Sequence, residues 1–319
     1  MKVIYLLIVT VVLCFASSVE LQAEESSAFR FEHSTGQVVI FHENQPLMTY
    51  FYDDPLTTRP YFAHVKTLQG TQVTRNHPPQ EGDLQDHASY HPGIFFAFGD
   101  ISGNDYWRLK TKVKHAGFVK SSDDFQNSFT VENHYLNGNG NETVCVEQCR
   151  YTFLKESGGY VIQMTSHFFS PDHDFYFGDQ EEMGLGIRLA TSLREKGGNG
   201  RILNSEGLQS AAKTWGQTAK WVDYSGTINE QQVGVMLMTD PKNIRPSWWH
   251  NRDYGLFVAN LFGQKAMHQG PTSQLVVKQG DRFRLGYGIY IHESDELSQS
   301  DLQKIYDYYS KQTKQVAAE

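Results

Sequence analysis

The residues best suited to chemistry lie in three segments, at positions 86–91, 181–188 and 248–254. The first holds Asp86-His87 and, four residues later, His91, flanked by glycine and proline. Two imidazoles and a carboxylate in such a loop could hold a metal, or a histidine could transfer protons while the aspartate orients it. A structural alternative is that both imidazoles only hydrogen-bond loop carbonyls. Because short histidine spacings are weak evidence for a metal, we favour direct substrate contact or proton transfer.

In the second segment, Glu181-Glu182 precede the sequence Met-Gly-Leu-Gly-Ile-Arg, which ends at Arg188. In an alternating strand, Glu182, Gly184, Gly186 and Arg188 share one face. A carboxylate and a guanidinium would then lie on one surface with little bulk between them, which suits substrate binding. A salt-linked strand pair is the alternative.

The third segment, Trp248 to Tyr254, combines aromatic rings with His250 and Arg252. Aromatic faces stack on sugar rings, and His, Arg and Asn side chains supply directional hydrogen bonds to hydroxyl groups. Tryptophans are common in sandwich cores, but a core segment would also have to find partners for the charged side chains. Trp215, Trp221 and Asp223 could extend the same platform, or form only a strand and a turn.

These segments give a predicted site. The acid or base candidates are His87, His91 and His250, with Glu182 as their carboxylate partner. The predicted substrate-binding residues are Arg59, Asp86, Arg188, Trp215, Asn243, Trp249, Arg252 and Asn260. We expect neither a metal nor a cofactor. The sequence contains no Gly-x-Ser-x-Gly motif, phosphate-binding glycine-rich loop or Cys-x-x-Cys pair, which argues against serine hydrolysis and nucleotide chemistry.

The elements that must position these residues are predicted to be strands. Short segments rich in Val, Ile, Phe, Tyr and Thr recur between turn-forming residues, as in an antiparallel sandwich or barrel. The clearest are Phe29–His33, Gln37–His42, Leu47–Tyr52, Phe125–Leu136, Thr143–Leu154, Gly159–Phe169, Gly234–Met238 and Phe283–His292. One helix is predicted near the C-terminus, where Leu302, Ile305, Tyr306 and Tyr309 follow helical spacing after a Ser298–Asp301 cap.

Charge and cysteine usage narrow the class further. The net charge is −8, and the few Lys and Arg residues are dispersed, which fits neither a nucleic-acid nor a membrane partner. Cys145 and Cys149 lie four residues apart in a predicted strand, a separation of about 13 Å that is beyond disulfide reach. We therefore predict free thiols.

The N-terminus predicts export. A positive start, an apolar run from Val3 to Ala16 and a small residue, Ala23, before an acidic pair are typical of a secretory signal peptide. We expect residues 1–23 to be removed, leaving one β-sandwich domain over residues 24–319 that is secreted or periplasmic and not bound to a membrane.

The sequence also resembles a known family. The motifs that carry the resemblance are Asp86-His87 with His91-Pro92-Gly93, the run from Gly103 to Arg108, the run from Trp221 to Gly226, and Trp249-His250 with the run from Arg252 to Gly255. They are similar to the DUF6807-like secreted bacterial proteins, a family of unknown function often labelled "PmoA family". A methane-oxidising membrane subunit needs several membrane helices, so we treat that label as a misnomer. The resemblance implies an exported β-sandwich common where complex carbohydrate is degraded, with no established catalytic residue.

The expected fold is all-β and mostly antiparallel, a large β-sandwich with a C-terminal helix. Fold-level analogy extends this to the galactose-mutarotase-like supersandwich of sugar epimerases and polysaccharide lyases. The leading functional prediction is a carbohydrate-active enzyme: a glycoside hydrolase, lyase or epimerase acting on a sugar, a polysaccharide or another small molecule. The alternatives are a non-catalytic sugar-binding protein that uses a tryptophan platform and, third, a metal-dependent hydrolase or oxygenase.

Overall fold

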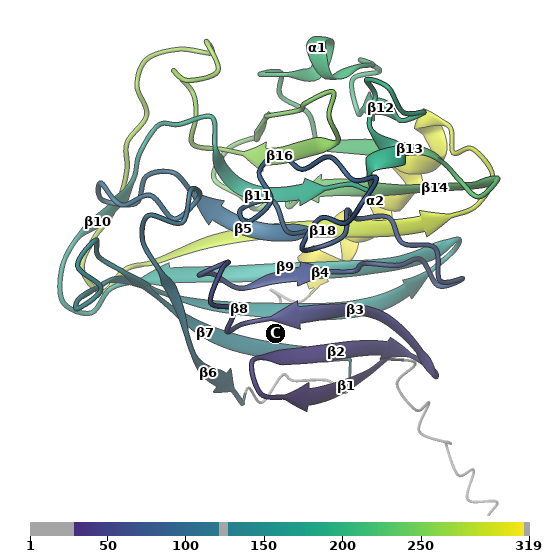
Figure 1. Cartoon of the computed structure of the whole chain (residues 1–319). Helices are drawn as coiled ribbons and strands as arrows, with labels where there is room; N and C mark the ends of the chain where they lie inside the picture. Colours follow the sequence, from purple (N-terminus) through teal and green to yellow (C-terminus); the bar gives the residue numbers. More distant parts are fainter. Residues whose placement is uncertain (1–28, 121–126, 316–319) are drawn as a thin grey trace, which may run out of the picture.

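The computed structural model describes residues 29–120 and 127–315, which form two large antiparallel sheets packed face to face (Figure 1). The first sheet has the strand order β1 (Phe29–Ser34), β2 (Gln37–His42), β3 (Gln45–Phe51), β4 (Tyr61–Ala63), β5 (Ile94–Phe98), β11 (Met183–Arg188), β16 (Leu256–Asn260) and β15 (Trp248–Trp249). The second has the order β12 (Arg201–Asn204), β13 (Trp221–Ile228), β14 (Gln231–Thr239), β18 (Arg282–Glu293), β9 (Gly159–Phe169), β8 (Thr143–Glu156), β7 (Ser128–Leu136) and β6 (Val113–Val119). A small third sheet pairs β10 (Phe175–Phe177) with β17 (Leu275–Val277).

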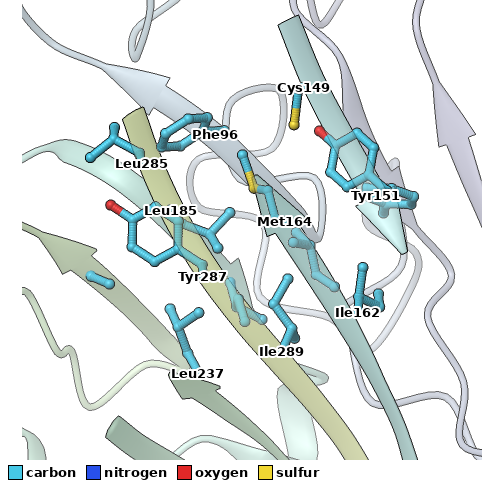
Figure 2. Packing of buried hydrophobic residues seen from close by; sticks show 14 of the residues in the cluster. Phe96, Cys149, Tyr151, Ile162, Met164, Leu185, Leu237, Leu285, Tyr287 and Ile289 are labelled. Carbon is cyan, nitrogen blue, oxygen red and sulfur yellow. The ribbon is translucent and has the colours of Figure 1, made fainter. Parts of the chain in front are cut away.

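The core lies between the two large sheets because each strand turns alternate side chains inward. On β5, Phe96 and Phe98 face this core, whereas Phe95 belongs to a separate cluster on the outer face. Figure 2 shows the inward cluster, in which Phe96 from the first sheet lies near Tyr287 from the second. The outer face of the first sheet is therefore left for the polar loops.

Helix α2 (Gln299–Gln315) packs on the outer face of the second sheet. Its Leu302, Tyr306 and Tyr309 are buried, as the helical spacing predicts. The predicted cap is present. The Asp301 amide donates to the Ser298 hydroxyl at 3.3 Å, and this hydroxyl donates to the Asp301 carboxylate at 2.6 Å. Gly288 of β18 leaves room for the Tyr309 ring, which a Cβ there would approach to 2.8 Å.

The architecture confirms the predicted fold class, a mostly antiparallel β-sandwich with a C-terminal helix. All eight predicted strands are present, although the predicted start of one at Phe125 lies outside the described residues. Residues 1–23, the predicted signal peptide, also lie outside them. Cys145 and Cys149 are both free and buried, as predicted.

Two short helical segments complete the described chain: the 3-10 turn Thr191–Leu193 and α1 (Ala211–Thr214). Within residues 29–120 and 127–315, no helix combines the length and apolar character needed to cross a bilayer.

Candidate functional site

The site is built on the outer face of the first sheet, over β5, β11 and β16. Apolar side chains, including Phe95, Val258 and the buried Trp107, cover this face. The loop between β4 and β5 runs along β11, where the Arg75 amide donates to the Arg188 carbonyl at 3.2 Å. The buried Arg75 guanidinium fixes the rest of this loop by donating to four carbonyl groups, those of Leu84, Asp86, His87 and His91.

Asp86 forms the centre of the site. Arg188, at the end of β11, donates to both Asp86 carboxylate oxygens, at 2.8 and 2.7 Å. The Nδ1 atom of His87 lies 2.6 Å from the same carboxylate. Burial alone would raise the pKa of Asp86, but hydrogen bonds from Arg188 and His87 and the charges of Arg188 and Arg75 outweigh it and lower that pKa. The carboxylate therefore stays ionised and orients His87.

The His87 imidazole lies in a stack of flat rings. The centroid of the His91 ring lies 4.6 Å from that of His87 and the centroid of the Tyr254 ring 5.8 Å from it, and both rings are nearly parallel to the imidazole. His91 stacks in turn on Phe95 at 5.4 Å. The side chain of His87 is 36% exposed. Asp86 holds Nδ1, and no group of the described chain is hydrogen-bonded to Nε2 of this partly exposed ring, so the second nitrogen is available to a ligand.

The backbone of His87 is left-handed, with φ of 50°. A non-glycine residue in this region costs roughly 1 kcal/mol, so the surrounding loop must hold it there. This conformation is stabilised by the loop contacts of Arg75 and presents the imidazole beside Asp86.

A second polar group lies next to the first and is centred on Arg252. Its guanidinium donates to Glu181 at 2.8 Å and lies 3.3 Å from Nε2 of His250. Tyr254 lies beside the first group, because its ring is 4.7 Å from the Arg188 guanidinium, and the charges of Arg252 and Glu181 in the second group also act on it. Burial raises the pKa of Tyr254, so its hydroxyl stays protonated at neutral pH.

The three predicted histidines differ in what they can do. Burial lowers the pKa of His91 well below its ordinary value, and neither of its ring nitrogens has a partner within the described ranges. Burial and the charge of Arg252 lower the pKa of His250 to about 3. Both rings are therefore neutral at physiological pH. Only His87 combines exposure with a carboxylate partner.

The predicted role of Glu182 needs correction. It lies just before β11 and forms an ion pair with Arg108, away from the histidines. The carboxylates beside the predicted histidines are instead Asp86 at His87 and Glu181 at His250. The predicted shared face of β11 is present only in part: Gly186 faces Phe95 on the outer side, where a Cβ would approach the ring to 2.8 Å.

Four predicted substrate-binding residues are structural in this fold. The buried guanidinium of Arg59 donates to carbonyls of Tyr106, Trp107 and Tyr90. Asn243 exchanges hydrogen bonds with the backbone of Gly286, and Asn260 does the same with the 180–181 and 262–263 backbone. The Trp249 indole is fully buried and donates to the Ala219 carbonyl at 3.1 Å. A buried indole has no face for a sugar ring, so this part of the prediction is withdrawn.

Trp215 lies in a neighbouring cavity of about 470 Å³ that Arg252 also lines. The site therefore brings together Asp86, His87, His91, Arg188, His250 and Arg252 from the prediction, with Trp215 beside them.

The sequence did not point to Tyr254 and Glu181 as site residues. Both lie inside the segments singled out, but only the fold shows which way they point. In the part of the chain that the structure describes, no three His, Cys, Asp or Glu side chains are grouped so that they could hold a metal ion.

Comparison with solved structures finds proteins of similar fold at very low identity. A galactose mutarotase-like protein from Lactobacillus casei ATCC 334 has 8% identity and a TM-score of 0.38, covering 83% of this chain and all of its own. A galactose mutarotase related enzyme from Lactobacillus acidophilus has 10% identity and a TM-score of 0.34, covering 85% of this chain and 99% of its own. A putative kojibiose phosphorylase from human microbiome has 10% identity and a TM-score of 0.32, covering 83% of this chain and 29% of its own.

No curated protein matches this chain. One family model does, over residues 37–307, which is most of the sequence, and it confirms the family resemblance of the motifs. The chain belongs to the family of unknown function DUF6807.

Proposed function

We propose that this chain is an exported carbohydrate-active enzyme in which His87 transfers a proton at a sugar bound on the outer face of the first sheet. One observation carries the proposal: Asp86 holds Nδ1 of a partly exposed His87 at 2.6 Å and leaves Nε2 available. An ionised carboxylate that fixes one ring nitrogen sets the tautomer and orientation of the imidazole, as general acid–base catalysis requires.

The arrangement favours isomerisation or elimination over two-carboxylate hydrolysis. A glycosidase of that kind needs one protonated carboxylic acid opposite a second carboxylate. The pairing with Arg188 lowers the pKa of Asp86 and keeps it ionised, and the Glu181 carboxylate is taken up by an ion pair with Arg252. His87 and the protonated hydroxyl of Tyr254 are then the groups able to move protons on a substrate. Epimerisation removes a proton from a C–H bond and returns one to the opposite face. Mutarotation opens and recloses the bond between C1 and the ring oxygen, with a proton taken from the C1 hydroxyl and one given to the ring oxygen. β-Elimination removes a C–H proton and breaks the neighbouring C–O bond, with a proton given to the leaving oxygen.

The test compares wild type with His87→Ala on two probes. Polarimetry follows the mutarotation of freshly dissolved α-D-galactose, and ultraviolet absorbance follows unsaturated products from polygalacturonate. Because acid–base groups typically contribute a factor of about 100 or more, His87→Ala should lower the rate of whichever reaction the wild type catalyses by at least that factor. A melting curve checks that the variant folds.

His134→Ala is the matched control. His134 is also partly exposed and also bonded to a carboxylate, Glu132, at 3.0 Å, but it lies on β7 of the other sheet. It should retain the wild-type rate. Equal rates for wild type and a folded His87→Ala would remove His87 from catalysis, and a wild type inactive on both probes would leave the sugar-binding alternative.

A further inference from the structure

We propose that the cavity beside Arg252 is a subsite for a neutral sugar ring, with Trp215 as its stacking surface. The inference rests on the proposed substrate class but not on catalysis by His87. The cavity measures about 470 Å³, inside the range of roughly 300–1,000 Å³ that is usual for small-molecule sites. Glu195, Lys196, Trp215, Asn251, Arg252 and Asp253 are among the residues that line it.

The walls come from three segments that are bonded to one another. The Glu195 carboxylate accepts a hydrogen bond from the Ala211 amide at 2.8 Å. The Lys196 amide donates to the Asp253 carbonyl at 2.9 Å, and the Trp215 amide donates to the Ala211 carbonyl at the same distance. The cavity therefore keeps its shape without a ligand, and a preformed site loses little conformational entropy on binding.

Two buried polar atoms on residues that line the cavity lack partners among the described residues. Asn251 is only 2% exposed; its amide nitrogen donates to Thr214 at 2.8 Å, but its carbonyl oxygen accepts nothing. The indole nitrogen of Trp215 is buried and donates to nothing. An unsatisfied buried polar group costs about 1–3 kcal/mol, so a ligand that satisfies both is favoured. A sugar hydroxyl, which donates and accepts, matches this acceptor and donor pair.

The charges around the cavity select a neutral ligand. Glu195 and Asp253 are acidic, and the positive charge of Arg252 is already paired with Glu181. Lys196 is exposed at the rim. A ligand carboxylate would face two carboxylates with one solvated ammonium as its partner, whereas hydroxyl groups can donate to both acids.

Arg252 connects this cavity to the proposed catalytic site. It lines the cavity, and it also forms the ion pair with Glu181 beside Tyr254. Ser210, which also lines the cavity, has a backbone φ of 78° and is a second strained non-glycine residue there. A sugar unit in the cavity would therefore lie next to the unit processed at His87.

Calorimetric titration with glucose, galactose and xylose tests the subsite, with glucuronate as the matched anion. Wild type should bind at least one neutral sugar and bind glucuronate at least tenfold more weakly than glucose. Trp215→Ala should weaken the neutral sugar at least tenfold by removing the stacking surface. Asp253→Asn should weaken the affinity for the neutral sugar severalfold. Because this change is conservative, it still tests the subsite if Trp215→Ala fails to fold.

Trp248→Ala is the control, since Trp248 is a half-buried tryptophan that packs on Arg245 away from the cavity. It should bind like wild type. The tenfold loss caused by Trp215→Ala should also be found in a His87→Ala background, which separates this subsite from the proposed catalysis. Unchanged affinity in Trp215→Ala and Asp253→Asn, or no neutral sugar bound by wild type, would overturn the subsite. A His87→Ala variant that loses turnover but still binds the neutral sugar through Trp215 would support the subsite while removing nothing from it.

Discussion

At the residue scale, Asp86 determines how the site is arranged. It joins the buried Arg188 to the partly exposed His87, so one carboxylate both neutralises a cation and orients an imidazole. Arg188 is almost fully buried and lies 4.7 Å from the Tyr254 ring. Without Asp86, this guanidinium would lose its carboxylate partner.

Asp86→Asn should therefore destabilise the protein at neutral pH by about 1–3 kcal/mol, less than for a fully buried pair because Asp86 is one-third exposed. The pKa of Asp86 is lowered in the folded chain. Its stabilisation is thus complete above the unfolded pKa of about 3.9 and is lost as pH falls towards the folded pKa. Urea unfolding at pH 7 and pH 3 measures this. The gap between wild type and variant should shrink at pH 3, and an equal gap at both values would contradict the assignment.

At the element scale, the alternation of strand β8 turns polar as well as apolar side chains into the core. Cys145, Glu147 and Cys149 all face the core between the sheets. Glu147 accepts hydrogen bonds from Ser166, Asn133 and Tyr135. Burial nevertheless raises the pKa of Glu147, because the hydrogen bonds only partly offset the loss of water.

The raised pKa of Glu147 makes a prediction about pH. A raised pKa favours folding below the unfolded pKa of about 4.3, and that contribution is lost as pH rises through the folded value. Glu147→Gln cannot ionise, so it should gain stability relative to wild type as pH rises from 4 to 8, by about 1.4 kcal/mol for each tenfold difference in proton affinity between the folded and unfolded chains. Denaturant unfolding across this range measures the trend, with exposed Glu142→Gln as the control for lost charge. A difference that stays constant with pH would show that Glu147 ionises normally in the core.

Elements with a long periodic pattern were predictable, and short ones were not. Strand β8 has 14 residues and β9 has 11, and side chains alternate between buried and half-buried along most of each, while α2 repeats its apolar side chains over several turns. β4, β15 and β17 have only two or three residues, too few for a period to emerge. Their pairing depends on neighbouring strands that are distant in sequence.

At the scale of the whole molecule, the site exists because β5, β11 and β16 are neighbours in the first sheet. This order brings the segments at 86–91, 181–188 and 250–254 together on one face. Composition alone singled out all three segments, since each concentrates polar and aromatic residues around turns. Which carboxylate meets which cation could not be predicted, because Glu181 and Glu182 differ only in the direction that the local backbone gives them. The same limit applies to Trp248 and Trp249, of which only Trp249 is fully buried.

We propose above all that a sugar binds over this face, beside His87. The most direct test is nuclear magnetic resonance of histidine rings labelled with ¹³C and ¹⁵N, titrated with whichever of glucose, galactose and xylose binds most tightly. The ring signals of His87 should shift in proportion to occupancy, while those of His134, on the other sheet, stay fixed. Saturating sugar that moves the His134 signals and leaves those of His87 unchanged would contradict the account.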